Sequence, residues 1–200
     1  WAFIIPTDKS SPSNDYCVGY CYNSNITNKE DAEKNFLDMF DVEIKKHLNY
    51  RNYVAKDPVI DDRIFLNGNR LFFLEPLESS STQTYIEIVR AFFDYYLPGR
   101  VNLDRIRENT REYMIECQNF LLWHYKSGSK YDTPFWKYAT SLEVEYDDKF
   151  KKYYEWVSKN NRYDSLPDVY GGIGGQSLYG QWPAYSFRNW YEGINTKLNT

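Results

Sequence analysis

Residues 73–81 read Phe73-Leu74-Glu75-Pro76-Leu77-Glu78-Ser79-Ser80-Ser81, and this stretch decides how the chain around it folds. Apolar residues precede it from position 64 to 74, and an amphipathic run follows from 84 to 97. Because Pro76 fixes φ and cannot continue a helix, the pattern predicts a strand, a tight turn and a helix start. The hydroxyl residues after the turn can cap that helix. Such a turn presents backbone amides and the positive end of a helix dipole, which suits a small anion.

Length and charge limit the kinds of protein that the chain can be. Two hundred residues suffice for one domain with a sizeable core. The net charge is −4 and the isoelectric point is about 5.3, whereas a nucleic-acid surface needs clustered lysine and arginine. No apolar run reaches the roughly 18 residues that a membrane helix needs. We therefore expect a soluble, cytoplasmic protein that binds neither nucleic acid nor a membrane.

Aromatic residues are unusually frequent, at 19% of the chain with 20 tyrosines. At that density they either fill a core between helices or line a pocket for a flat ligand. The three cysteines indicate reduced, buried thiols rather than a disulfide or a metal site. Cys17 and Cys21 lie about 13 Å apart if the segment is a strand, which is too far for a disulfide. Cys117 stands alone on a predicted helix.

Periodicity predicts a few strands followed by helices. Residues 1–6 and 16–22 read as a hairpin, and short strands are expected at 59–60 and 64–66. A capping box at Thr27-Asn28-Lys29-Glu30 predicts a helix over 28–47. Further helices are expected over 84–97, 102–126, from 134 toward 142, and over 144–158.

Three segments carry a resemblance to a known family. Residues 75–81 resemble the Glu-Pro-Leu-Glu-Ser turn of flavin-dependent halogenases of the tryptophan halogenase type. Trp1-Ala2-Phe3-Ile4-Ile5-Pro6 is similar to the family's Trp-x-Trp-x-Ile-Pro motif, with Phe3 at the second tryptophan position. His124-Tyr125 followed by Asp132-Thr133-Pro134-Phe135-Trp136 resembles a third family segment. The resemblance is good over residues 1–140 and looser beyond.

The resemblance implies an α+β, mainly helical fold that forms the C-terminal part of a two-part flavin monooxygenase-like protein. Residues 1–82 would hold strands, one helix and the flavin- and halide-proximal turn, and residues 83–200 a helical substrate-binding region. Family members begin with a Gly-x-Gly-x-x-Gly unit and carry an upstream catalytic lysine, so we expect this portion to be inactive alone. Residues 171–176 are glycine-rich but follow no predicted strand, and they do not supply the missing unit.

The resemblance also assigns roles around the turn. Glu78 would be the catalytic carboxylate that positions or activates the halogenating species. The predicted flavin contacts are Gly68, Asn69, Pro76 and Leu77. The amides of Ser80 and Ser81 would bind the halide, although the family has threonine and glycine there. A glycine-like backbone at position 81 would strain the serine.

Other aromatic residues receive roles in the same way. Trp1 and Phe3 would separate flavin from substrate. The candidates for holding an aromatic substrate are Tyr179, Trp182, Tyr185 and Trp190. His124 is expected to be structural, because no metal-ligating partner is visible at a suitable spacing.

The implied activity is halogenation of an electron-rich, indole- or tryptophan-like compound. It would use dioxygen, chloride or bromide, and reduced FAD from a separate flavin reductase, and a homodimer is left open. Two alternatives stay open: a flavin-dependent hydroxylase of the same superfamily, and a non-catalytic domain that binds aromatic ligands. The sequence does not name the substrate, its regiochemistry or the preferred halide.

Overall fold

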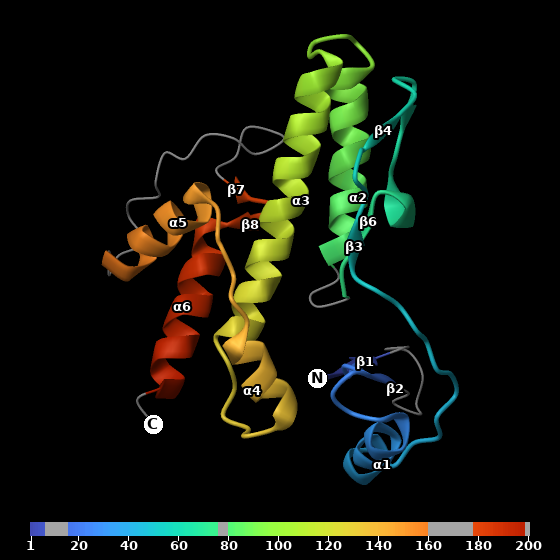
Figure 1. Cartoon of the computed structure of the whole chain (residues 1–200), viewed down its shortest axis with the longest axis vertical. Helices are drawn as coiled ribbons and strands as arrows, with labels where there is room; N and C mark the ends of the chain where they lie inside the picture. The colour runs from blue at the N-terminus through green and yellow to red at the C-terminus, as the bar shows by residue number, and fades with distance from the viewer. Residues whose placement is uncertain (7–15, 76–79, 160–177, 199–200) are drawn as a thin grey trace. The chain divides into compact units, whose positions relative to one another are not determined.

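The computed structural model describes residues 1–6, 16–75, 80–159 and 178–198 (Figure 1). The chain divides into two compact units, each described here by itself. One comprises residues 1–49 with 131–138, and the other comprises 50–130 with 139–200. The resemblance predicts a different division, at residue 82, between a flavin- and halide-proximal part and a substrate-binding part. That division is one of function, and it stays a prediction.

The first unit holds a hairpin and a helix. Strand β1 (Ala2–Pro6) pairs antiparallel with β2 (Tyr16–Tyr20), which confirms the predicted hairpin. Helix α1 covers Lys29–Met39, and the Asn28 side chain caps it by accepting the backbone N–H of Asp31 at 2.8 Å. The predicted cap one residue earlier, in the capping box, is therefore wrong.

Helix α1 is also shorter than the predicted range of 28–47. The backbone becomes extended at Phe40, with φ −133° and ψ 129°. Apolar spacing continues beyond that point, but Leu48 is 72% exposed. Since most helical stability in proteins comes from burying an apolar face, periodicity without burial does not prolong the helix.

The described residues of the second unit form three small antiparallel ribbons. Strand β3 (Tyr53–Val54) pairs with β6 (Phe72–Phe73), β4 (Val59–Ile60) with β5 (Ile64–Phe65), and β7 (Leu178–Tyr179) with β8 (Trp182–Pro183). The short 3₁₀ helix η1 (Gly68–Arg70) links β5 to β6. The strands predicted at 59–60 and 64–66 are thus confirmed. The quoted stretch, residues 73–81, begins at the last residue of β6.

Helices make up most of the second unit. They are α2 (Ser80–Ala91), which continues into the π-helix η3 (Phe92–Tyr96), α3 (Leu103–Lys126), α5 (Asp148–Lys159) and α6 (Ala184–Leu198). Helix α4 (Pro134–Ser141) spans the boundary between the units. Figure 1 shows α2 and α3 side by side. The predicted mainly helical α+β fold is confirmed, with α5 beginning later than expected because Asp147 caps it through the Phe150 amide at 2.9 Å.

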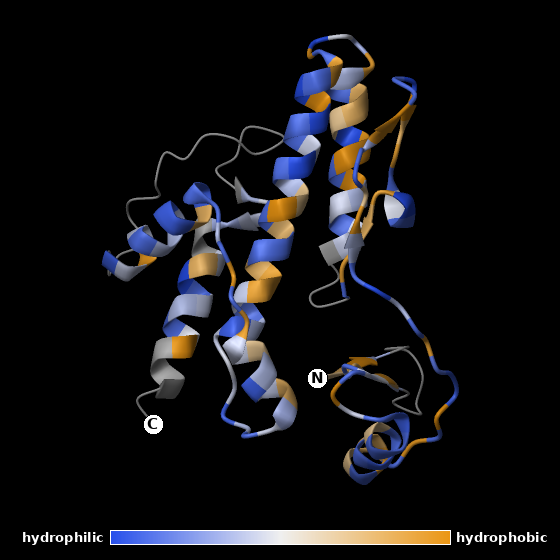
Figure 2. Cartoon of the chain, viewed as in Figure 1, coloured by the Kyte–Doolittle hydropathy of each residue, from blue (hydrophilic) through white to orange (hydrophobic). Residues whose placement is uncertain are grey.

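The core of the second unit is aromatic. It joins β6, α2, α3, α5, α6 and the β7–β8 ribbon, and its fully buried side chains include Phe72, Met114, Phe120, Tyr153, Tyr179 and Phe187. Figure 2 shows orange and blue residues mixed along these helices, as amphipathic packing requires. Across the described ranges, the helices are all too short or too polar to cross a membrane.

An ion-pair cluster fastens the β4–β5 ribbon to α3. Arg107 donates to Asp57 at 3.1 Å and to Asp62 at 2.6 Å. Asp61 and Asp62 form the turn of this ribbon with positive φ values of 50° and 54°, a conformation that strains residues other than glycine. The contact with Arg107 on α3 helps to hold that turn.

The pKa of Asp57 gives a first prediction. The backbone N–H of Val59 and then the Arg107 guanidinium lower this pKa below its usual value of 3.8. A carboxylate with a lowered pKa contributes stability above its unfolded-state pKa and loses it as the pH falls through the folded-state pKa. We expect Asp57→Asn to destabilise the protein at pH 7 and to match the wild type at about pH 2 in urea unfolding. An equal deficit at both pH values would contradict this.

Gly180 gives a second prediction. It has φ 55°, and a Cβ there would lie 2.9 Å from the Cys117 sulfur and 3.1 Å from the Cys117 nitrogen. Gly180→Ala should therefore lower the free energy of unfolding by about 2 kcal/mol or more, from strain and overpacking. The matched control is Gly193→Ala in α6, where no described atom lies within 4 Å of the new Cβ. Gly193→Ala should be neutral or stabilising by up to about 1 kcal/mol.

Candidate functional site

The turn predicted around Glu75 and Glu78, called the acidic turn below, comprises residues 75–79 between β6 and α2. Pro76, Leu77, Glu78 and Ser79 fall outside the described residues, so the catalytic role of Glu78 and the flavin contacts of Pro76 and Leu77 stay predictions. The structure describes the two flanks of the turn. On one side, Leu74 is 4% exposed and anchors the chain in the core. On the other side, α2 begins at Ser80.

Ser81 joins the two flanks. Its hydroxyl donates to the Leu74 carbonyl at 3.4 Å, so the entry and the exit of the turn are tied together. Ser81 lies in the first turn of α2 with a helical backbone, and the non-glycine residues with positive φ in the described chain are Asp61 and Asp62. The strain considered for a serine at position 81 therefore does not arise.

The first turn of α2 provides the donors that an anion needs. The first four backbone N–H groups of a helix have no partner within the helix, and those of Ser80 and Ser81 belong to this set. The helix dipole adds positive potential at the same place. A halide is a chemically suitable ligand for these amides, and their assignment as the halide site stays a prediction.

Gly68 and Asn69 form the start of η1. Gly68 has φ 58°, and no described atom lies within 4 Å of the position a Cβ would take, so the backbone is open to close approach. Asn69 accepts a hydrogen bond from the Tyr85 hydroxyl at 2.6 Å, and Asn67 donates to the Tyr85 carbonyl at 3.3 Å. Tyr85 lies on α2, so this glycine turn is fixed to the same helix that follows the acidic turn.

Trp1 and Phe3 lie on the same side of the first unit's hairpin, two residues apart in sequence. Their ring centroids are 5.8 Å apart and their planes are inclined by 46°. Phe3 covers Gly19, its partner on β2, because a Cβ at Gly19 would lie 2.0 Å from the Phe3 ring. The two rings form a small aromatic surface, and their role as a barrier between flavin and substrate stays a prediction.

The predicted substrate-binding aromatics occupy the core of the second unit. Tyr179 is fully buried, and Trp182 is 5% exposed and stacks on Phe120 with centroids 4.3 Å apart. Trp190 stacks on His124 at 3.8 Å. The Tyr185 side chain lies outside the described part of the chain. The three described rings pack against protein side chains, and a substrate role for them stays a prediction.

His124 is structural in its described contacts, in line with its sequence interpretation. Its Nδ1 lies 2.8 Å from the Phe120 carbonyl, and its ring also contacts Phe120 at 4.9 Å. In the described ranges, no group of three or more histidine, cysteine, aspartate and glutamate side chains is arranged to hold a metal ion. Cys117 is fully buried, as expected, whereas Cys17 is exposed and Cys21 is partly exposed, so the predicted burial is wrong for these two.

A buried polar network underlies the β7–β8 ribbon. Asp147 accepts hydrogen bonds from the Tyr179 hydroxyl, from Asn119 at 2.8 Å and from the Phe150 amide at 2.9 Å. Burial, together with the neighbouring Asp147 carboxylate, raises the pKa of Tyr179, which therefore stays a neutral donor. The sequence analysis did not predict this network. The feature of the sequence that points to it is the Asp147-Asp148 pair just before the amphipathic segment of α5.

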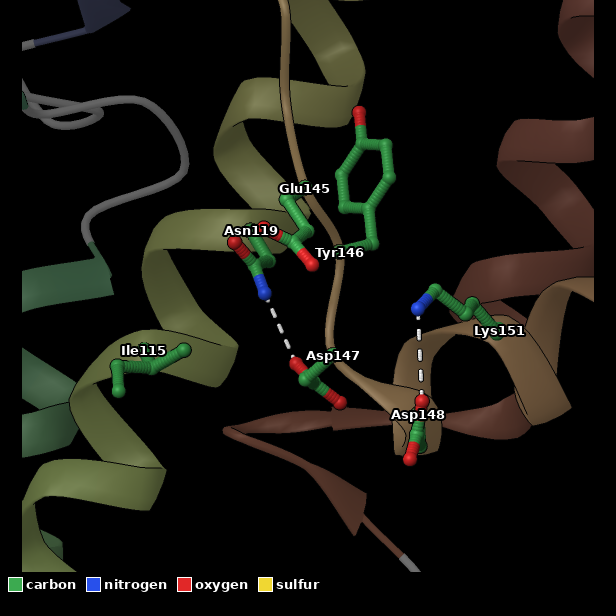
Figure 3. A pocket seen from close by; sticks show the side chains of 7 residues that line it. All are labelled: Ile115, Asn119, Glu145, Tyr146, Asp147, Asp148 and Lys151. Atoms are coloured by element: carbon green, nitrogen blue, oxygen red, sulfur yellow. Dashed lines mark hydrogen bonds and ion pairs between the residues drawn. The ribbon is translucent and has the colours of Figure 1, made fainter.

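An open pocket of about 380 Å³ lies beside this network (Figure 3). Its lining residues are Ile115, Asn119, Glu145, Tyr146, Asp147, Asp148 and Lys151. Figure 3 shows Asn119 directed at Asp147 and Lys151 directed at Asp148, so these polar groups satisfy one another. None of the described residues predicted to contact flavin, halide or substrate lines this pocket.

A largely buried ion pair between Lys149 and Glu116 lies close to the network. Lys149 donates to Glu116 at 2.6 Å, and the Gly180 amide also donates to Glu116 at 2.5 Å. Burial raises the pKa of Glu116, whereas the Lys149 contact lowers it. This pair joins α3, α5 and the β7–β8 ribbon, which makes it a structural feature of the core.

The family described as Tryptophan halogenase matches residues 1–192. The chain therefore belongs to the tryptophan halogenase family.

Solved structures agree on the fold. A thermophilic tryptophan halogenase, Th-Hal from Streptomycin violaceusniger, superposes with a TM-score of 0.70 at 17% identity, over 96% of this chain and 41% of that one. The tryptophan 6-halogenase SttH from Streptomyces toxytricini gives 0.70 at 21%, over 97% and 38%. Tar14, a tryptophan C-6 flavin-dependent chlorinase from taromycin biosynthesis, gives 0.64 at 24%, over 88% and 35%. The chain spans less than half the length of each.

The Asp147 network gives a third prediction. Asp147→Ala removes a helix cap and leaves the buried Tyr179 and Asn119 with fewer partners, so the free energy of unfolding should fall by about 2–4 kcal/mol. The control is Asp148→Ala, because the side chain of Asp148 is 91% exposed and pairs only with Lys151 in the described chain. It should change stability by about 0.5 kcal/mol or less in the same urea titration. Equal losses in the two variants would refute the network's role.

Proposed function

We propose that this chain forms part of a flavin-dependent halogenase acting on an electron-rich aromatic compound of the indole or tryptophan type. The complete enzyme would use dioxygen, chloride or bromide, and reduced FAD delivered by a flavin reductase. The single observation that carries the proposal is the family match over residues 1–192, which includes the acidic turn. The named activities of Tar14 and SttH support the substrate class.

The described flanks of the turn are compatible with flavin and halide. The backbone at Gly68 is open, so a large planar group can approach it without meeting a side chain. Asn69 would be placed beside that group, because Tyr85 holds it against α2. When bound, reduced FAD supplies the reducing power that lets dioxygen oxidise the halide.

The chain's own residues would then place the reacting groups. The amides of Ser80 and Ser81 at the start of α2 would bind the halide, with no hydroxyl contact needed from Ser81, whose Oγ is engaged by Leu74. The Glu78 carboxylate would position or activate the halogenating species and take up the proton that the aromatic ring releases. Trp1 and Phe3 would keep the aromatic substrate away from the flavin.

A hydroxylase is the second candidate, and the Ser80-Ser81 pair is the observation that favours it. Serine replaces both the threonine and the glycine that are usual in the family at these two positions. Among the properties of the site, halide affinity is the one that these replacements would alter most directly. The helical backbone at Ser81 argues for halogenation, because the amide donors persist despite the replacement.

Glu78 provides a fourth prediction. In the full-length enzyme with flavin reductase, Glu78→Gln should lower kcat for halogenation by on the order of 100-fold or more, because proton transfer by a positioned carboxylate is lost. Affinity for FAD should stay unchanged, since the predicted flavin contacts are elsewhere. Product is measured by mass spectrometry with chloride and, separately, with bromide. The control is Glu112→Gln, an exposed carboxylate on α3 that should leave kcat unaltered.

The same assay separates the candidate functions. Added halogen supports the halogenase, and added oxygen without halogen supports the hydroxylase. Tight binding of an aromatic ligand with no turnover, or turnover that Glu78→Gln leaves intact, would reject the catalytic proposal for this turn.

A further inference from the structure

Tyr85 lies one helical turn after Ser81 on α2, and both side chains contact the chain at residues 72–74. Ser81 donates to the Leu74 carbonyl at 3.4 Å, and the Tyr85 hydroxyl lies 3.3 Å from the Phe72 carbonyl. Residues four apart on a helix share one face. The two contacts therefore run along one face of α2 and fix its register against the segment that contains β6.

The Tyr85 hydroxyl has a closer partner in the glycine turn that precedes β6. It lies 2.6 Å from Asn69 Oδ1, which is a normal length for a hydroxyl hydrogen bond, whereas the Phe72 carbonyl is 3.3 Å away. A phenol has one proton to donate, so Asn69 is its main acceptor. Burial raises the pKa of Tyr85, which keeps the hydroxyl protonated at neutral pH.

Two further contacts hold Tyr85 in place. Its ring packs edge-on against the fully buried Phe72, with centroids 5.7 Å apart. Its backbone carbonyl accepts a hydrogen bond from the Asn67 side chain at 3.3 Å. Asn67 and Asn69 flank Gly68 in the sequence, so both arms of the glycine turn are tied to one tyrosine.

The contact with Tyr85 decides which end of the Asn69 amide is available to a ligand. Because Oδ1 is engaged, the Nδ2 group keeps its two N–H donors, and none of the described residues accepts from it. Asn69 is exposed, and the adjoining Gly68 has φ 58° and no described atom within 4 Å of the position a Cβ would take. Oriented amide donors beside an open backbone suit a ligand rich in oxygen acceptors, and FAD is one.

We propose that Tyr85 is a positioning residue for flavin binding: its hydroxyl holds the Asn69 side chain by Oδ1, which leaves the Nδ2 donors to a flavin oxygen beside the open Gly68 backbone. This inference rests on the proposed function and on the predicted flavin contacts of Gly68 and Asn69. It deepens that function by giving a role to a residue outside the three family segments. Tyr85 acts through Asn69 and not by touching the flavin.

Tyr85→Phe should weaken FAD binding and leave the other predicted sites intact. The ring and its packing on Phe72 remain, and only the hydroxyl is lost. The Asn69 side chain then has conformational freedom that flavin binding must remove. We expect the Kd for FAD to rise about 3- to 10-fold, as for the loss of one hydrogen bond. At saturating FAD, kcat and the KM values for halide and aromatic substrate should stay within about twofold.

The experiment titrates FAD into the full-length enzyme and follows the quenching of flavin fluorescence, which needs no turnover. Steady-state kinetics with a flavin reductase give kcat and the two KM values. The matched control is Tyr95→Phe, on the π-helix that continues α2, where the tyrosine is 37% exposed. It should leave the Kd for FAD and the kinetic constants unchanged. Thermal unfolding of each variant checks that the fold persists.

A double-mutant cycle tests whether Tyr85 acts through Asn69. Asn69→Ala changes an exposed side chain and should raise the Kd for FAD at least as much as Tyr85→Phe does. Adding Tyr85→Phe to Asn69→Ala should then weaken binding by no more than about twofold, because the same hydrogen bond is already broken. Additive losses would overturn the positioning role. So would a wild-type Kd for FAD in either single variant, even if the melting temperature falls.

This inference and the proposed function fail in different ways. A wild-type enzyme that binds no FAD would reject both. A wild-type enzyme that binds FAD, with equal affinity in Tyr85→Phe, would reject this inference alone. Products with added oxygen and no halogen would reject halogenation, and weaker FAD binding in Tyr85→Phe would still support the role of Tyr85, because a flavin-dependent hydroxylase needs the same flavin contact.

Discussion

The fixed spacing between strand β6 and the first turn of α2 is the constraint on which the rest of the candidate site depends. Leu74 is anchored in the core, and Ser81 closes the turn onto its carbonyl. Everything proposed for the intervening residues requires that the helix amides and the Glu78 carboxylate keep a set separation. Tyr85 extends this constraint, because it ties the Gly68-Asn69 step to the same helix. Helix α2 therefore carries the Ser80 and Ser81 amides that are predicted to bind halide, and it also contacts the Gly68-Asn69 turn through Tyr85.

The aromatic richness of the chain has a largely structural explanation in the second unit. Phe120 contacts Trp123, Trp182 and Phe187, and Phe150 contacts Tyr146 and Tyr179. Small strands cannot bury much surface by themselves, so large rings bridge them to the helices. The buried hydroxyl of Tyr179 needs a polar partner within this core, and Asp147 supplies it while also starting α5. The residues that pack the aromatic core thus lie beside the carboxylate that gives the buried Tyr179 hydroxyl its hydrogen-bond partner.

Local patterns predicted several elements with shifted boundaries, and they did not predict β3, β7, β8 or α6. The hairpin, the strands at 59–60 and 64–66 and the α2–α3 pair follow from alternation and helical spacing, which act over a few residues. The end of α1 was missed because it depends on whether Leu48 is buried, which is a tertiary property. In the candidate site, the roles of Glu78 and of the Ser80 and Ser81 amides come from a motif, and they stay predictions. The hydrogen bond from Tyr179 to Asp147 could not be predicted, since it joins segments that only the folded chain brings together.

The close approach of the β7–β8 turn to Cys117 has a practical consequence. The sulfur is completely shielded, with the backbone of Gly180 lying directly over it. A thiol reagent can reach it only when this ribbon lifts away from α3. The rate of Cys117 alkylation in native buffer would therefore report how often the aromatic core opens.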